Sequence, residues 1–487
     1  MVGIRVSSPV VSRRDIGLRS ERGPILAAVM LSMSLVAIDT TILATAVPTV
    51  VADLGGFTQF PWLFSVYVLT AAVVTPLAGK LADIVGRKPV LIGGIVVFVL
   101  GSVLCGVAWS MTSLIVFRAI QGLGAGAVQP MAMTIVGDVY TMAERSKVQG
   151  YLASVWAGAA VVGPTLGGLF ADYLNWRGIF LINVPLGVVA VILLRRLDST
   201  HQRRASSVDW LGALLLTGGG VALLLGLLEG GQRWAWDSGQ SIGLFVTAVV
   251  MLVGFAYAET RAKDPVLPGW IVRHRVLNSA AGAQFVVGVV LMGLTTYVPL
   301  YGQGVLGHGA LVSGLALAAM TIGWPIAASQ AGRLYLTVGF RACLLIGTAL
   351  AILGGLLLLV VDPGSSLLMV AAACFVIGLG FGLVAAPSVV AAQSSVSYAD
   401  RGVVTGASMF SRSVGSAVGV AAFGAIANAA VSSRLDGSVP SMDMLPVDVL
   451  AESLQLVFVV SCAVTVLLIL ASAFMPARVD EPSPLDP

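Results

Sequence analysis

The sequence predicts an all-α polytopic membrane protein with fourteen transmembrane helices, and three observations lead to this prediction. Hydrophobic residues make up 57% of the 487 residues and charged residues only 10%, with a mean hydropathy of +0.97. A soluble domain carries about 25% charged residues because its surface faces water, so most of this surface must face lipid. The other two observations are the length of the apolar runs and the placement of lysine and arginine between them.

The apolar runs have the length of membrane spans. A helix needs roughly 20 apolar residues to cross the ~30 Å hydrocarbon core of a bilayer. Fourteen runs of this kind start near Ile25, Pro61, Pro89, Thr112, Val148, Gly178, Trp210, Ser241, Val276, Leu311, Cys343, Ser366, Val403 and Ser453.

Lysine and arginine predict the orientation, because cytoplasmic loops retain them. With the N-terminus inside, 22 of the 27 Lys and Arg residues fall on the cytoplasmic side, three fall outside, and Arg118 and Arg412 lie within spans. Both termini are therefore expected in the cytoplasm. Residues 1–23 read as a basic tail without the features of a secretory signal, and residues 476–487 as a disordered tail.

The chain also repeats itself. The segment Gln121–Gly126 recurs 256 residues later as Ile377–Gly382. A few residues out of step, the loop Gly79–Gly86 recurs as Gly332–Gly339.

The repeat predicts two homologous six-helix halves, residues 24–196 and 276–475. Residues 197–275 would form a two-helix insert with its linkers. Parallel halves with the substrate site between them are a known design of secondary transporters.

Five motifs follow one another on the expected spans: Ile38–Pro48, Gly79–Lys88, Leu114–Gly126, Gly158–Gly168 and Trp176–Pro185. Together they resemble the major facilitator superfamily, and within it the fourteen-spanner drug:proton antiporters of the multidrug efflux type. The resemblance implies the major facilitator fold, with two six-helix halves plus two extra central helices. It also implies a secondary active transporter that exports lipophilic or amphipathic drugs or metabolites in exchange for protons by alternating access.

Location and partners follow from the same resemblance. We expect a multi-pass protein of a bacterial-type inner (plasma) membrane that acts as a monomer. Its partners would be protons, membrane lipid and a small lipophilic substrate, cationic substrates included, with no cofactor, nucleotide or nucleic acid. The alternative is a dedicated exporter of a single lipid, siderophore or antibiotic.

The loop Gly79–Lys88 has a physical reading of its own. Gly79 and Gly86 permit a sharp turn and a close helix approach, and Asp83 can lie against the N-terminal dipole of another helix. The family implies that Asp83, Arg87 and Asp138 lock the two halves together on the cytoplasmic side. The alternative is a positively charged loop that Asp83 merely caps. In the second copy, Leu336 stands where Asp83 would align, so the lock would be asymmetric.

Gly163, Pro164 and Gly167 form the antiporter motif that the resemblance assigns to the fifth span. The proline removes one helix hydrogen bond, and the glycines offer a face of small residues for tight helix packing. Packing alone would also explain this pattern.

Two intramembrane charges are the candidates for proton coupling. Asp39 lies roughly 21 Å from the cytoplasmic end of its span and Arg118 roughly 9 Å from the outer end of its own, at 1.5 Å per residue. A lone charge in the membrane costs about 2.5–3.5 kcal/mol on insertion scales, so such residues are usually paired and functional. A purely structural ion pair is the alternative.

Aromatic, amide and cationic side chains on several spans are candidates for lining a substrate cavity. Taken singly, each is more often a packing residue or an interface anchor than a ligand contact. The set suits an apolar cavity with few fixed hydrogen bonds. It comprises Trp62, Tyr67, Gln121, Trp156, Gln284, Tyr297, Trp324 and Arg412.

Other function classes lack their signatures. A membrane enzyme would need a polar catalytic cluster, a primary pump a GxxxxGK[ST] phosphate loop, and a channel a repeated filter loop or rings of charge. None of these patterns is present in the sequence. The four cysteines lie far apart in apolar runs and the three histidines show no metal-ligand spacing, so no metal site is expected.

Overall fold

The computed structural model describes residues 17–55, 59, 62–195, 209–231, 233–262, 269–432 and 446–479. Most of the predicted N-terminal tail and the end of the predicted C-terminal tail lie outside these ranges, as does most of the linker before residue 209. The described residues form helices and no β-strand, which confirms the predicted all-α class.

The helices form two groups with a pair of helices between them along the chain. The first group contains α2 (Gly23–Leu54), α3 (Trp62–Val85), α4 (Arg87–Gly106), α5 (Met111–Val139), α6 (Met142–Tyr173), α7 (Gly178–Leu181) and α8 (Asn183–Leu194). The pair is α9 (Trp210–Glu229) and α10 (Gly239–Glu259). The second group contains η1 (Ile271–Arg273), α11 (Arg275–Gly304), α12 (Ala310–Val338), α13 (Phe340–Leu359), α14 (Leu367–Ser394), η2 (Tyr398–Asp400), α15 (Arg401–Ser432), α16 (Val447–Val466) and α17 (Leu468–Phe474).

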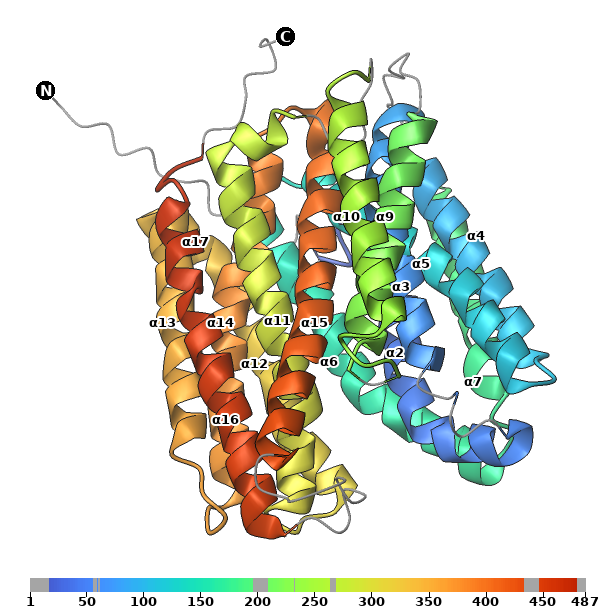
Figure 1. Ribbon diagram of the computed structural model, residues 1–487. Helices are drawn as coiled ribbons and strands as arrows, with labels where there is room; N and C mark the ends of the chain where they lie inside the picture. Colours follow the sequence, from blue (N-terminus) through green and yellow to red (C-terminus); the bar gives the residue numbers. More distant parts are fainter. Residues whose placement is uncertain are drawn as a thin grey trace, which may run out of the picture.

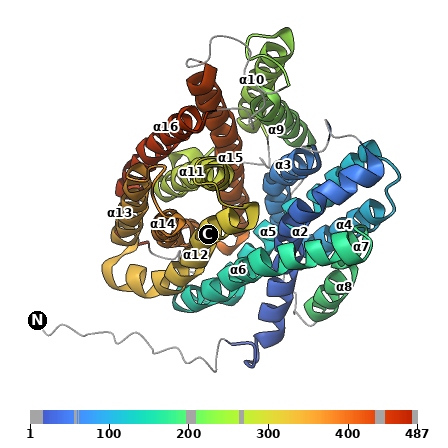
Figure 2. The same ribbon diagram turned by 90° about the horizontal axis from the view of Figure 1, so that it is seen from below.

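The long helices run side by side, with α11–α17 on the left and α2–α8 on the right of Figure 1. Seen from below, α9 and α10 stand at one edge of the molecule beside α3 and α15 (Figure 2). Helix α9 packs on both groups, and α10 packs on α9. The insert therefore covers one seam between the two groups without entering either.

Eleven helices among the described residues are long and apolar enough to cross a membrane. Two shorter apolar stretches, Gly178–Leu194 and Leu211–Leu227, add to them, and α6 has 32 residues. About eleven to fourteen membrane-crossing helices follow, and the number fourteen stays a prediction.

The internal repeat is visible in the packing of two glycine pairs. A Cβ on Gly122 or Gly126 of α5 would lie 2.6 Å from the Tyr67 carbonyl oxygen or 2.3 Å from that of Ala71 on α3. In the second group, Gly378 and Gly382 of α14 meet backbone carbonyls of α12 in the same way, at Met320 and Trp324. Each close approach needs glycine on one side, so the repeated sequence builds the same helix contact twice.

The turns of the repeated loop match as well. Gly86 has a φ of 107° and Gly339 a φ of 89°, a backbone conformation that favours glycine. The two loops differ in what holds them. Leu336 is 48% exposed, and the turn at Gly339 is held by the C-terminal segment, where the Ala477 carbonyl accepts the Phe340 N–H at 2.9 Å.

The predicted span near Gly178 is a broken helix. Helix α7 ends at Leu181 and α8 starts at Asn183. Pro185 has no N–H to donate to the preceding turn, which gives the physical reason for the interruption.

The two ends of the helix bundle differ in charge. One end, the basic end, carries the Gly86 turn and the starts of α6, α11, α13 and α15, where most of the predicted cytoplasmic cations lie. The other, the opposite end, carries the start of α5 and the loop before α7.

Candidate functional site

Asp39 and Arg118 meet in the interior of the first group. Arg118 Nη1 lies 2.6 Å from Asp39 Oδ2, and each side chain is 1% exposed. Asp39 comes from α2 and Arg118 from the first turns of α5, which start at the opposite end. The structure thus brings the two intramembrane charges that the sequence singles out into direct contact.

Amides and a hydroxyl surround the Asp39 carboxylate. Gln121 Nε2 donates to Asp39 Oδ1 at 2.7 Å, and Asn183 Nδ2 lies 3.3 Å from the same oxygen. Ser102 Oγ accepts from both amides, at 2.7 Å from Gln121 and 3.1 Å from Asn183. Four helices, α2, α4, α5 and α8, thus converge on one carboxylate.

Arg118 is held on its other sides by α3. Its Nε donates to the Leu63 carbonyl at 3.1 Å, and its guanidinium stacks on the Tyr67 ring at 4.1 Å from the centroid. The Tyr67 hydroxyl is buried and has no hydrogen-bond partner among the described residues. A carboxylate beside a cation can bind or release a proton when that contact is broken or made, because the cation favours the charged form of the acid.

At the basic end, Asp83 binds the start of a helix from the other group. Its carboxylate accepts the N–H of Gly402 at 3.2 Å and that of Val403 at 2.9 Å, in the first turn of α15. Such a carboxylate satisfies free N–H groups and meets the positive end of the helix dipole. The expectation that Asp83 faces the N-terminus of another helix agrees with this contact.

Arg87 joins Asp83 to the end of α5. Its guanidinium lies 3.0 Å from Asp83 Oδ1 and 3.2 Å from Asp138 Oδ2, and all three side chains are less than 10% exposed. Across the interface, Arg87 donates to the Tyr398 carbonyl at 2.5 Å and stacks on the Tyr398 ring. Arg401 of α15 lies 3.5 Å from Asp138.

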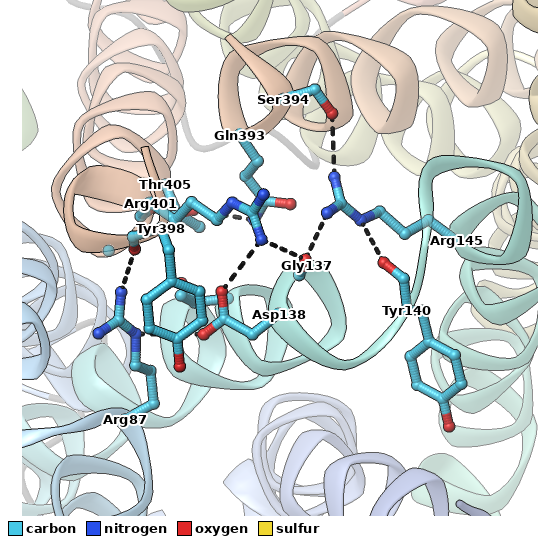
Figure 3. A network of polar contacts seen from close by, with 12 residues as sticks. Arg87, Gly137, Asp138, Tyr140, Arg145, Gln393, Ser394, Tyr398, Arg401 and Thr405 are labelled. Atoms are coloured by element: carbon cyan, nitrogen blue, oxygen red, sulfur yellow. Dashed lines mark hydrogen bonds and ion pairs between the residues drawn. The ribbon is translucent and has the colours of Figure 1, made fainter. Parts of the chain in front are cut away.

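Further cations and amides extend this network, as Figure 3 shows. Arg401 Nη1 donates to the Gly137 carbonyl at 2.9 Å, and Arg145 Nη1 donates to Ser394 Oγ at 3.0 Å. Gln393 of α14 lies between the groups, with Nε2 bonded to Thr405 Oγ1 at 2.9 Å and to the Met133 carbonyl at 3.3 Å. These hydrogen bonds and ion pairs between the two groups all lie at the basic end.

Glycines set how closely α3 and α15 approach. A Cβ on Gly79 would lie 2.5 Å from the Gly402 carbonyl oxygen, and one on Gly402 would lie 2.5 Å from Asp83 Oδ1. Gly79 is thus needed for helix approach and Gly86 for the turn, as predicted for this loop.

Gly163 of the antiporter motif packs on α2. A Cβ there would lie 2.7 Å from Thr41 Cβ and 3.1 Å from the Ile42 nitrogen. Thr41 Oγ1 also donates to the Ala159 carbonyl at 3.0 Å. Gly167 is buried on the same helix, and Pro164 lies within α6 without ending it. The motif therefore joins α6 to the helix that carries Asp39.

The structure divides the expected cavity residues into two sets. Trp62, Trp156 and Trp324 are half-buried, whereas Tyr67, Gln121, Gln284 and Tyr297 are buried. Gln121 departs furthest from the expectation, because it is 0% exposed and part of the Asp39 network, not a surface residue of a cavity. The reason is that an amide in an apolar span needs hydrogen-bond partners.

Arg412 lies in the middle of α15, where this helix packs on α11. A Cβ on Gly288 of α11 would lie 2.2 Å from the Arg412 carbonyl oxygen, and Ser411 Oγ donates to the Ala281 carbonyl at 2.8 Å. Arg412 is half-buried and makes no hydrogen bond or ion pair with the described residues. It is a cation in the middle of a membrane helix with free donors.

Sequence reasoning missed several members of these networks. Asn183 and Ser102 near Asp39, and Arg145, Gln393 and Tyr398 at the basic end, were not singled out as site residues. An amide within an apolar run was the signal available for Asn183 and Gln393. For Arg145, the signal was its match to Arg401 at the repeat offset of 256 residues.

Comparison with known proteins gives concordant matches. The sequence model of the Major Facilitator Superfamily matches residues 29–420. The chain is 38% identical over 442 residues to the multidrug transporter protein MdtP of Bacillus subtilis (strain 168), covering 90% of this chain and 82% of that protein. It is 32% identical over 419 residues to multidrug resistance protein 3 of the same organism, covering 86% and 82%.

A solved structure shares the fold. The human organic anion transporter MFSD10 (TETRAN) superposes with a TM-score of 0.68 over 93% of this chain and 99% of that one, at 14% sequence identity. Together with the match over most of the chain, this makes the protein a multi-pass membrane transporter of small molecules and not an enzyme. The helical fold, the relatives and the repeated halves all lead to one family: this chain belongs to the Major Facilitator Superfamily.

Proposed function

We propose that this transporter exports small lipophilic or amphipathic molecules, drugs or metabolites, in exchange for protons by alternating access. The observation that carries the proton coupling is the buried pair of Asp39 and Arg118 at 2.6 Å. The names of the relatives, a multidrug transporter and a multidrug resistance protein, support the class of cargo.

Asp39 is the proposed proton carrier because of its depth. Every other carboxylate among the described residues lies in a loop or in the first or last two turns of a helix. Protonation of Asp39 would remove the charge that holds Arg118 and leave the hydrogen bonds of Gln121 and Asn183 to a neutral acid. The Tyr67 ring lies on Arg118, and its buried hydroxyl has no hydrogen-bond partner among the described residues.

The network around Asp83, Arg87 and Asp138 is the proposed lock of one conformation. It closes the basic end by binding α15 through its first turn. Opening this end would break two backbone hydrogen bonds of Asp83 and the contacts of Arg87 with Tyr398. Gly79 and Gly86 shape the lock, and the antiporter motif of Gly163, Pro164 and Gly167 packs α6 on the proton-carrying helix through Gly163.

Substrate would bind between the two groups of helices. Trp62, Trp156 and Trp324 offer aromatic surface to lipophilic cargo, and an aromatic face also attracts cations. Arg412 offers guanidinium donors to a carbonyl or hydroxyl of the cargo. Tyr297 and Gln284 are buried, with Gln284 Nε2 bonded to the Ala385 carbonyl at 2.9 Å.

We also propose the topology and division of the chain expected from the sequence. The basic end faces the cytoplasm of a bacterial-type cell, both termini lie there, and the protein acts as a monomer. The functional halves are residues 24–196 and 276–475, and the insert is 197–275.

Substrate-induced proton release from purified protein tests the proposal. Parent protein should release protons when a transported dye is added, and should move that dye in proteoliposomes only with a pH gradient. Asp39→Asn keeps the size of the side chain but cannot carry a proton, so it should abolish both signals while still binding dye. Proton release by Asp39→Asn equal to that of the parent would place the carrier elsewhere.

A further inference from the structure

A groove with a volume of about 790 Å³ lies between α11 and the α16–α17 segment at the basic end. Helices α11 and α17 lie side by side at the upper left of Figure 1. Arginines and an amide form its mouth, and the residues farther in are apolar or small. The lining includes Arg273, Arg275, Gly282, Val286, Leu470 and Phe474.

The mouth of the groove offers the guanidinium groups of two arginines. Arg275 Nε donates to the Phe474 carbonyl at 2.7 Å, which fixes the side chain and caps the end of α17. Arg273 is exposed and makes no hydrogen bond or ion pair with the described residues. No acidic residue lines the groove among the described residues. The mouth is therefore complementary to an anion.

The walls farther in suit an aliphatic chain. Leu470 and Phe474 are 60% and 62% exposed, so the groove is open along α17. From Arg275 to Val286, α11 rises by eleven residue steps, which is roughly 16 Å at 1.5 Å per residue. Half of a ~30 Å hydrocarbon core has the same depth. The groove thus matches one leaflet in length, with its cations at headgroup level.

We propose that this groove binds one anionic phospholipid of the leaflet at the basic end. The phosphate lies on Arg273 and Arg275, and an acyl chain lies along Leu470 and Phe474. Basic pockets between membrane helices are known to bind acidic headgroups, and a guanidinium forms its strongest hydrogen bonds with such charged acceptors. The proposal does not depend on what the protein transports.

Gly282 provides a variant that removes the chain site without breaking the fold. A Cβ at this position would meet only the Ala471 Cβ, at 3.7 Å, which is ordinary contact. Gly282→Leu therefore places its side chain into the groove and not into a neighbouring backbone. Arg273→Gln removes a headgroup contact and leaves the Arg275 cap of α17 in place.

The test is lipid binding to the purified full chain by native mass spectrometry, with thermal unfolding as a second readout. The probes are dioleoyl phosphatidylglycerol, dioleoyl phosphatidylcholine and glycerol 1-phosphate. We expect one tightly bound phosphatidylglycerol, weaker phosphatidylcholine, and no binding of the free phosphate because it has no chains. Arg273→Gln should weaken phosphatidylglycerol binding roughly five-fold, the usual contribution of one cation near an anionic membrane surface.

Arg333→Gln is the matched control, since Arg333 is an exposed cation at the same end but outside the groove. It should bind phosphatidylglycerol like the parent. Equal losses in Arg273→Gln and Arg333→Gln would mean diffuse attraction and overturn the site. Full binding by Gly282→Leu, or equal affinity for the two lipids, would overturn it as well. Binding of a transported dye in place of lipid would overturn it too, because the groove would then be a substrate site.

Discussion

One guanidinium organises the polar centre of the first group of helices. Arg118 uses Nη1 for both Asp39 and Gln121, at 2.6 Å each, while Nε reaches the Leu63 carbonyl. Its flat face lies on the Tyr67 ring. This arrangement needs a planar side chain with several donors in fixed directions, which an ammonium group does not offer.

We therefore expect Arg118→Lys to fail although it keeps the charge. A lysine would leave the Leu63 carbonyl and one of the two Nη1 acceptors without a donor. Breaking a buried ion pair costs about 3–5 kcal/mol, and an incomplete replacement should cost a large part of this. The measurements are the unfolding temperature in detergent and proton-coupled dye transport, and both should fall well below the parent.

Arg177→Lys is the control for this change. Arg177 Nη1 lies 2.8 Å from Asp53, but the two side chains are 29% and 46% exposed. Hydrogen bonds from Trp176 and Arg177 hold the pKa of Asp53 below its ordinary value of 3.8. The ion pair of Asp53 and Arg177 is therefore formed at any pH above that value and is lost only under more acid conditions. Exposed pairs contribute little, so the control should unfold like the parent. Unfolding and transport like those of the parent in Arg118→Lys would mean that charge, not geometry, matters at Arg118, and equal loss in both variants would mean that burial of the pair is not the reason.

Depth along a helix was enough to single out Asp39 and Arg118 from the sequence, because few charges fall far from helix ends. It was not enough for Asn183 or Ser102. Small polar residues are common in membrane helices, and only their three-dimensional contacts show that they bind the same carboxylate. The polarity of Gln121 marks it as a candidate in the sequence, but the sequence does not show on which side of its helix the hydrogen-bond partners lie.

Helix α6 approaches α2 closely at Gly163. At Gly163 an added Cβ would meet Thr41 Cβ at 2.7 Å and the Ile42 nitrogen at 3.1 Å. Gly163→Ala should therefore push α6 away from α2 or strain both, at a cost of about 1–3 kcal/mol for an overpacked contact. Thermal unfolding should show a lower midpoint, and transport should fall because α2 carries Asp39.

Gly158 of the same helix supplies the comparison. A Cβ there would have nothing within 4 Å. Gly158→Ala adds the same methyl group to the same helix and should not lower the midpoint, since alanine favours helix by about 1 kcal/mol over glycine. Similar midpoints for the two variants would show that the α2–α6 contact is loose.

The sequence predicts where helices start better than it predicts which helices contact one another. The predicted span starts at Ile25 and Val403 agree with α2 and α15 to within two residues, whereas α6 starts at Met142, six residues before the predicted Val148. The charged first turns of α6 hid its start from a search for apolar runs. That α15 would be the helix facing Asp83 could not be read from composition, because any helix start offers the same free N–H groups.

At the scale of the whole molecule, the contacts at the basic end hold one arrangement of the two groups. We expect Asp83→Asn to weaken this arrangement, because an amide loses the charge that meets Arg87 and the dipole of α15. A carboxylate at a partly buried helix start contributes up to about 2 kcal/mol. Loss of this free energy is enough to shift the equilibrium between the arrangement closed at the basic end and the open one more than ten-fold. Transport should fall while expression stays near that of the parent.

Accessibility of a cysteine at the interface measures this shift. Ser329 of α12 faces Gly150 of α6 across the two groups, and Ser329→Cys should react faster with a maleimide when Asp83→Asn is added. Asp209→Asn is the control, since Asp209 caps α9 within its own chain segment and asparagine caps equally well. If Asp83→Asn leaves the labelling rate of Ser329→Cys unchanged, Asp83 only caps a helix start and does not hold the two groups together.

The repeat predicted the overall architecture better than any single motif did. Gly86 and Gly339 adopt the same left-handed turn, as their positions in the two copies suggest. The two copies differ at Leu336, as the sequence predicts. The loop of the first copy binds α15 of the second group through Asp83, whereas the turn of the second copy is held by the C-terminal segment at Ala477. Sequence alone showed that an acid was missing but not what had replaced it.

The end of the chain has a consequence for anyone who attaches a reporter protein to it. Met475 is fully buried, its carbonyl accepts Arg341 Nε at 2.7 Å, and Ala477 closes the turn at Gly339. A fluorescent or affinity tag joined before Ala477 would displace a piece of the folded core, whereas one joined after Val479 leaves these contacts whole. Residues 475–477 are thus part of the folded structure and cannot serve as a linker to a tag.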